Sequence, residues 1–291
     1  MPAGANRGNP AKAFTLKSLV PARFRRDSPV IPLVRLSGMI GGGSTFRVGL
    51  SLASIERTLA RAFATKAPAV ALLVNSPGGA AVQSHLIFKR IRALADEKGK
   101  KVIVAVEDVA ASGGYMIAAA GDEIIVDGSS IVGSIGVVSA GFGFPQLLDK
   151  IGVERRIYTA GTSKAMLDPF RPEREEDVAR LLALQADVHA DFIALVKRRR
   201  PTLVDDPDLF SGAFWSGTRA VELGLADRVG DLREVLRERF GENVRVLALA
   251  PERSMWRRRL GMFGGEPAVA GIVDRVITAI EERLMWNRFG L

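Results

Sequence analysis

A serine set among small residues is the first candidate for chemistry in this sequence. Ser112 lies in the segment DVAASGGYMIAAAGDE (108–123), with small residues before it and a glycine pair after it. A nucleophilic hydroxyl must be exposed at a tight turn, with backbone N–H groups close enough to stabilise the negative charge that develops during attack. Because glycine permits such turns and such close approach, the segment predicts that Ser112 is a nucleophile.

The base that would activate Ser112 has two kinds of candidate. The chain has two histidines, His85 and His189, and neither has an evident acidic partner beside it in the sequence. The G-x-S-x-G pattern of common esterases is absent. A lysine can replace histidine, since burial can lower a lysine pKa by about 3 to 5 units. Lys164, in the glycine-containing segment YTAGTSKAMLDPF (158–170), is therefore the candidate base.

Composition and charge exclude several classes of protein. The chain has 291 residues, of which 47% are hydrophobic and 25% charged, as in ordinary globular proteins, and it has no cysteine for a disulfide, a thiolate metal site or a nucleophile. The net charge of +9 is scattered, and no nucleic-acid-binding motif accompanies it, so nucleic acid is not an expected partner. No histidine–carboxylate cluster has metal-ligand spacing, so neither a metal nor another cofactor is expected. Without a long apolar stretch, a cytoplasmic location is expected.

Apolar runs that alternate with amphipathic segments predict an α/β fold. Strands are expected at 30–40, 69–74, 101–106, 123–127 and 154–161, and helices at about 50–64, 82–96, 111–121, 144–151, 173–199 and 231–240. This alternation at short intervals is typical of a largely parallel sheet. Four basic residues, 197–200, close the longest helix and are interpreted as complementing its dipole.

Four blocks resemble, in order and spacing, the motifs of the signal peptide peptidase A family of serine proteases. They are VNSPGG (74–79), VAASGGYMIAAAGDEI (109–124), GSIGV (133–137) and YTAGTSKAMLDPFRP (158–172), within a resemblance that covers about residues 30–240. In that family the serine of the A-S-G-G-Y block is the nucleophile and the lysine of the G-x-x-K block is the general base. The matching residues here are Ser112 and Lys164, 52 positions apart. The resemblance implies a crotonase-like, ClpP-related α/β fold of repeated ββα units.

Three further site residues are expected. The backbone N–H groups of Gly79 and Gly113 would form an oxyanion hole, since glycine lets the backbone approach the scissile carbonyl. Ser134 would orient the lysine, as the matching family serine does. An ordinary turn at the glycine pair that ends with Gly79, and a purely structural role for Ser134, are the alternatives left open.

The expected organisation has three parts. Residues 1–28 form a flexible basic arm, 29–247 the peptidase domain, and 248–291 an amphipathic helical extension that packs on protein or contacts a membrane surface peripherally. Family members assemble into rings or domes, so a homo-oligomer is expected. Relatives usually carry an N-terminal membrane anchor, which this sequence does not show, and that leaves open whether its substrates are signal-peptide remnants or other peptides and unfolded proteins.

Two other functions compete with a protease. An acyl-CoA enzyme of the crotonase type would also use glycine-containing loops and would need carboxylates near them, for which Glu107 and Asp108 qualify by position. That function leaves Lys164 and its glycine segment unexplained. A non-catalytic scaffold at the membrane surface would use the basic arm and the C-terminal helix.

Overall fold

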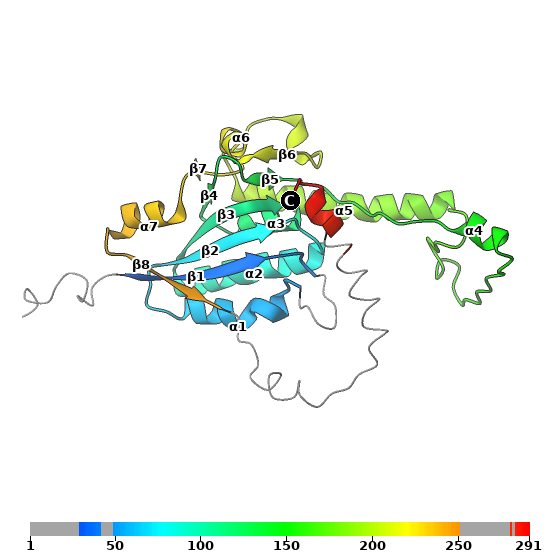
Figure 1. Ribbon diagram of the computed structural model, residues 1–291, viewed down its shortest axis with the longest axis horizontal. Coiled ribbons are helices and arrows are strands. Elements are labelled where there is room, and N and C mark those ends of the chain that lie inside the picture. Colours follow the sequence, from blue (N-terminus) through cyan, green and yellow to red (C-terminus); the bar gives the residue numbers. More distant parts are fainter. Residues whose placement is uncertain (1–28, 42–48, 251–279, 281–282) are drawn as a thin grey trace, which may run out of the picture.

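A single twisted sheet organises the protein. The computed structural model describes residues 29–41, 49–250, 280 and 283–291, so the predicted basic arm and most of the C-terminal extension lie outside the described residues. The described strands form one sheet in the order β6-β5-β3-β2-β1-β8, while β4 pairs with both β3 and β7 (Figure 1). The strands are β1 (Val30–Ser37), β2 (Ala69–Ser76), β3 (Lys101–Ala111), β4 (Glu123–Val126), β5 (Ile131–Gly133), β6 (Phe214–Ser216), β7 (Arg228–Val229) and β8 (Arg245–Leu249).

Helices cover both faces of the sheet. They are α1 (Leu52–Phe63), α2 (Ala81–Lys98), α3 (Gly113–Ala118), α4 (Pro145–Lys150), α5 (Glu175–Arg199), α6 (Gly217–Glu222) and α7 (Leu232–Phe240), with a short 3-10 helix at Pro207–Phe210. The larger core joins α1, α2, α3 and the C-terminal end of α5 to one face of the sheet. The smaller core joins Val235 and Leu236 of α7 to the other face.

The predicted fold class is confirmed. All strand pairs except β5–β6 are parallel, and helices follow β1, β2 and β3 in turn, as expected for a mixed α/β protein. Strand β8 pairs with β1, so the sheet continues past residue 247.

The strand predicted at 154–161 is wrong. These residues form no strand, and nearly all of them are exposed. They belong to an arm, residues 137–174 with α4, that projects from the body together with the N-terminal part of α5 (Figure 1). The β-like pattern does not form a strand here because, among the described residues, no strand lies alongside to pair with it.

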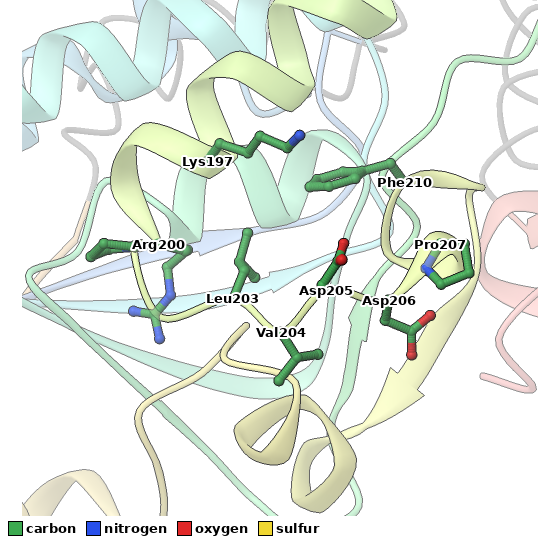
Figure 2. A pocket seen from close by; sticks show the side chains of 9 residues that line it. Lys197, Arg200, Leu203, Val204, Asp205, Asp206, Pro207 and Phe210 are labelled. Carbon is green, nitrogen blue, oxygen red and sulfur yellow. The ribbon is translucent and has the colours of Figure 1, made fainter.

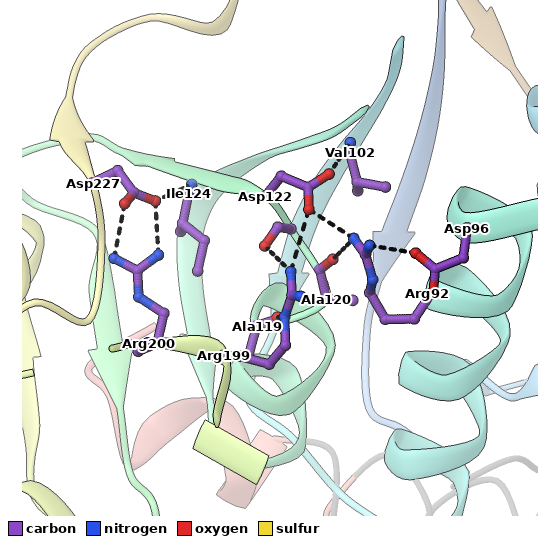
Figure 3. Close-up of polar contacts among 11 residues, drawn as sticks. Arg92, Asp96, Val102, Ala119, Ala120, Asp122, Ile124, Arg199, Arg200 and Asp227 are labelled. Atoms are coloured by element: carbon purple, nitrogen blue, oxygen red, sulfur yellow. Dashed lines mark hydrogen bonds and ion pairs between the residues drawn. The ribbon is translucent and has the colours of Figure 1, made fainter. Parts of the chain in front are cut away.

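Arginines fix the C-terminal end of α5 to the body. Arg199 donates from Nε to the carbonyl oxygen of Ala119 (3.0 Å) and from Nη2 to that of Gly121 (2.8 Å). Arg92, on α2, shares the carboxylate of Asp122 with Arg199 (Figure 3). The basic residues at the end of α5 therefore make specific tertiary contacts, beyond the dipole complementarity that the sequence suggested.

Arg200 forms a buried ion pair that joins α5 to the segment before β7. Its guanidinium binds both carboxylate oxygens of Asp227, at 2.8 and 3.0 Å, and donates to the carbonyl oxygen of Gly224 at 2.8 Å (Figure 3). Asp227 in turn accepts the N–H of Ile124, in β4. Removing the guanidinium would leave these acceptors unpaired in a largely buried position.

We expect the substitution Arg200→Ala to lower the free energy of unfolding by about 3 kcal/mol, the lower end for a broken buried pair because Asp227 is partly exposed. The matched control is Arg228→Ala, which removes an exposed pair with Glu238 and should cost under about 1 kcal/mol. Urea unfolding followed by circular dichroism measures both. Equal losses in the two variants would contradict this account of Arg200.

Candidate active site

Three parallel strands bring the predicted site residues to one edge of the sheet. Strands β2, β3 and β5 are adjacent and parallel, and Ala111 at the end of β3 is in register with Gly133 at the end of β5. Just beyond these strand ends come Gly79, Ser112 and Ser134, respectively. Sequence spacing does not specify strand register, but parallel pairing places all three residues at the same edge.

Ser112 has an unusual backbone conformation at the start of α3. Its φ of 51° and ψ of −120° are rare for a residue with a side chain and cost of order 1–3 kcal/mol. Two hydrogen bonds hold this conformation: its N–H donates to the carbonyl oxygen of Gly133 (2.8 Å), and its own carbonyl oxygen accepts the N–H of Met116 (3.0 Å). The hydroxyl has no hydrogen bond within the described part of the chain and is partly exposed. This is the geometry of an available nucleophile.

The helix that begins after Ser112 is firmly anchored. Tyr115 is completely buried and donates its hydroxyl to the carbonyl oxygen of Leu225 at 2.8 Å. Burial raises the pKa of Tyr115 above its ordinary value, so the phenol stays neutral and keeps its proton for this bond. Arg92 and Arg199 bind the carbonyl groups at the other end of the helix.

Two backbone N–H groups beside Ser112 are available as donors. Among the described residues, neither Gly79 nor Gly113 donates its N–H to an acceptor. Gly78 packs so closely on Ser112 that a Cβ at Gly78 would lie 2.9 Å from the Ser112 Cβ and 3.0 Å from the Gly113 nitrogen. The glycine turn thus lies directly against the candidate nucleophile, as an oxyanion hole requires.

Gly79 cannot carry a side chain without moving the backbone. Its φ is +137°, and a Cβ would collide with the carbonyl oxygen of Ile40. We expect Gly79→Ala to displace the donor N–H and lower kcat by about 10²–10³-fold, the typical cost of one oxyanion donor.

The control for Gly79→Ala is Gly99→Ala. Gly99 also has a positive φ, of +60°, but has nothing within 4 Å of the added Cβ, and it lies at the far end of α2. This variant should keep wild-type kcat and lose about 1 kcal/mol of stability. Steady-state hydrolysis of an unfolded protein, normalised to folded enzyme, compares them. A Gly79→Ala variant as active as the control would remove Gly79 from the site.

Ser134 lies beside Ser112 in register. Since Ala111 pairs with Gly133, the next residues on the two chains are Ser112 and Ser134, and both have positive φ values near 50°. Ser134 is buried, and its N–H donates to the carbonyl oxygen of Ala213 at 2.6 Å. Its hydroxyl has no hydrogen bond among the described residues and is available to a group that approaches Ser112.

Lys164 is not brought to Ser112 within one chain. It lies between α4 and α5 in the projecting arm, whereas Ser112 starts α3 in the body (Figure 1). The Lys164 side chain is exposed and forms no hydrogen bond or ion pair within the described ranges. The desolvated environment expected for a lysine base is therefore not present in the isolated protomer, and the dyad stays a prediction.

Neither histidine touches the Ser112 hydroxyl in the described structure. His85 packs its ring on Phe88, with ring centroids 6.3 Å apart. His189 instead approaches the site indirectly, since its Nε2 donates to the carbonyl oxygen of Ile135 at 3.2 Å. Sequence reasoning missed this contact, because a histidine in the middle of a helix has no local signature that marks its tertiary partner.

A separate cavity lies away from the strand edge. It has a volume of about 430 Å³ and is lined by the end of α5 and the loop that follows, including Lys197, Asp205 and Phe210 (Figure 2). Arg200 also lines it, but its guanidinium is bound to Asp227. The cavity contains none of the predicted catalytic residues, so we do not assign the chemistry to it.

Comparison with known families agrees with this site. Residues 95–243, just over half of the chain, match the model of peptidase family S49, and the protein therefore belongs to this family. The matched region contains Ser112, Gly113, Ser134 and Lys164, whereas Gly79 precedes it. The family resemblance drawn from the four sequence blocks is confirmed.

Named relatives include several proteases. The chain is 29% identical to "Putative protease slr0021" of Synechocystis sp., over 90% of this chain and 92% of that protein. It is 33% identical to "Putative signal peptide peptidase SppA" of Enterococcus faecium, over 57% of this chain and 48% of that protein. The chain is thus similar along most of its length to one protein named as a putative protease, and over more than half of its length to one named as a putative signal peptide peptidase.

A more similar relative is named as a transporter. "Na(+)/H(+) antiporter NhaA" of Brucella abortus is 58% identical over 95% of this chain, but the chain spans only 39% of that protein's length. In the described part of this chain, no helix is long and apolar enough to span a membrane. The name describes a protein of which this chain matches 39%, so it assigns no activity to this chain.

Proposed function

We propose that the protein is a serine endopeptidase in which Ser112 is the nucleophile and Lys164 the general base. The observation that carries the proposal is the convergence of three strand ends at one edge of the sheet: the strained Ser112, the glycine turn, and Ser134. Among the described residues, the Ser112 hydroxyl and the N–H of Gly79 have no hydrogen-bond partner. Membership in a peptidase family supports the reaction class.

The proposed reaction proceeds through an acyl-enzyme. Neutral Lys164 accepts the Ser112 hydroxyl proton as the oxygen attacks the peptide carbonyl carbon, and the N–H groups of Gly79 and Gly113 stabilise the resulting oxyanion. Collapse breaks the C–N bond, and the Lys164 ammonium protonates the leaving amine. Water then attacks the ester with Lys164 again accepting a proton, which returns to the Ser112 oxygen as the acid product leaves.

The proposed dyad forms between two copies of the chain. Lys164 lies on the projecting arm, away from Ser112 of its own chain, so the arm of a neighbouring copy would deliver it. The arm and the adjoining turn of α5 expose an unusual set of large apolar side chains, among them Phe142 (82% exposed) and Tyr158 (90%), together with Val138, Leu147, Ile151, Val153, Leu182 and Leu184. So many large apolar side chains exposed along one segment are typical of an interface. Burial in that interface would also provide the desolvation that a lysine base requires.

Unfolded polypeptides or peptides are the proposed substrates, because an extended chain can reach a nucleophile at a sheet edge. Signal-peptide remnants belong to this class. The cytoplasmic location and peripheral membrane contact expected from the sequence remain predictions.

The two carboxylates that the acyl-CoA alternative would use each have a partner in the structure. Glu107 forms an ion pair with Arg35 (2.7 Å), and Asp108 accepts a hydrogen bond from the side chain of Asn75 (2.6 Å). Both carboxylates are therefore engaged in contacts within the sheet. The scaffold alternative gives no reason for the strain at Ser112.

Parallel hydrolysis assays test the proposed function. The protein is incubated with unfolded casein and, separately, with an acyl-CoA thioester. Cleavage of casein that depends on Ser112, with no thioester turnover, is the expected result. Thioester turnover without peptide cleavage would favour the crotonase-type enzyme, and neither activity would favour the scaffold.

A further inference from the structure

A side chain of α5 holds the turn that contains Ser134. His189 is in the middle of α5, and its Nε2 donates to the carbonyl oxygen of Ile135, the residue directly after Ser134. Because a carbonyl oxygen can only accept, the imidazole must carry its proton on Nε2, and the bond can exist in the neutral or the charged ring.

Three consecutive residues of this turn are restrained by hydrogen bonds from different parts of the chain. The carbonyl oxygen of Gly133 accepts the N–H of Ser112, and the N–H of Ser134 donates to the carbonyl oxygen of Ala213. The third restraint is the His189 bond, which alone among these comes from a side chain. The first of these bonds joins Gly133 to the nucleophile Ser112. A shift of the turn after Gly133 would therefore change the position of Ser134 relative to Ser112.

Helix α5 is a rigid support for this contact. At its C-terminal end, Arg199 binds the carbonyl groups that follow α3, the helix that starts after Ser112 (Figure 3). At its N-terminal end, α5 continues from the segment with Lys164. The same helix therefore contacts the structures around Ser112 and Ser134 and connects to the arm.

We infer that His189 is a positioning residue for the active site: through the Ile135 carbonyl it fixes Ser134 at the distance from Ser112 at which Ser134 can orient the lysine base. The inference rests on the proposed function, since it requires catalysis by Ser112 and an orienting role for Ser134. His189 itself touches no reacting atom. The effect of His189 on kcat should therefore depend on the presence of the Ser134 hydroxyl.

A double-mutant cycle tests this inference on the full-length protein with unfolded casein as substrate. His189→Leu should lower kcat about tenfold with little change in KM, as expected for the loss of one hydrogen bond. His189→Gln, whose amide can donate to the same carbonyl, should stay within about twofold of wild type. His85→Leu is the matched control, because it makes the same change at the other histidine and should leave kcat unaltered. Melting temperatures and active-site titration correct each rate for the folded fraction.

The decisive comparison is made in a Ser134→Ala background. There, adding His189→Leu should lower kcat no further than Ser134→Ala does alone. Losses that multiply, failure of His189→Gln to retain activity, or a Ser134→Ala variant as active as wild type would each overturn the inference while leaving the protease intact. Ser112→Ala is run in the same series, and full activity of that variant would overturn the proposed function and this inference together.

Discussion

Replacing Ser112 by alanine is expected to lower kcat for unfolded casein by on the order of 10⁴-fold or more, as loss of a nucleophile does in other serine proteases. The hydroxyl is the atom that forms the acyl-enzyme, and no other serine at this edge has both the strained backbone and the two unpaired glycine N–H groups beside it in the described structure. Activity that remains would come from substrate binding and the oxyanion donors.

The melting temperature distinguishes loss of the nucleophile from misfolding of the Ser112→Ala variant. The Ser112 side chain makes no hydrogen bond in the described structure, so its removal should change the melting temperature by no more than a few degrees. A Ser112→Ala variant that melts like wild type and still cleaves casein at more than about one tenth of the wild-type rate would reject Ser112 as the nucleophile.

The second large effect concerns Lys164 and its delivery by a neighbouring copy. Lys164→Ala alone should lower kcat by about 10³–10⁴-fold, as loss of a general base does. Mixed oligomers of Ser112→Ala and Lys164→Ala chains should recover activity, because some sites then combine an intact Ser112 from one chain with an intact Lys164 from the other. With random mixing in equal amounts, about one quarter of the sites are complete.

Co-expression with two different affinity tags and sequential purification yields the mixed oligomers, and each single variant carrying both tags is the control. Because sequential purification removes the unmixed oligomers, recovery to between about one quarter (large rings) and about one half (dimers) of wild-type activity per site is expected. No recovery in a verified mixed oligomer would mean that the dyad closes within one chain, and would require the arm to fold back toward its own sheet edge.

Strands β1 to β4 could be predicted from the sequence because they are largely buried, whereas the shorter strands β5, β6, β7 and β8 were not predicted. The runs at 69–74 and 102–106 are continuous and apolar, which is typical of parallel strands between two layers of helices. The segment 154–161 has strand-like residues but no partner strand, and a local pattern does not contain that information. Whether a segment has a partner strand depends on the fold of the whole chain.

The candidate site, too, could be predicted only in part from the sequence. Gly79 and Ser112 each follow a predicted apolar strand, and parallel pairing brings them together, whereas the three-residue strand β5 before Ser134 was not predicted. The close packing of Gly78 on Ser112 was not predicted, because sequence spacing does not give such close contacts. The environment of Lys164 could not be predicted for a further reason. In the proposed dyad, a second copy of the chain forms part of that environment.

Covalent labelling directly tests whether Ser112 is the nucleophile and Lys164 its general base. Wild type, Ser112→Ala and Lys164→Ala are treated with a serine-directed phosphonate between pH 6 and 10, a range that brackets a lysine with a lowered pKa. Peptide mass spectrometry then locates the adduct. The account predicts an adduct on Ser112 in wild type, none in Ser112→Ala, and labelling slowed by about 10²-fold or more in Lys164→Ala. An adduct on a different serine, or equal labelling with and without Lys164, would contradict it.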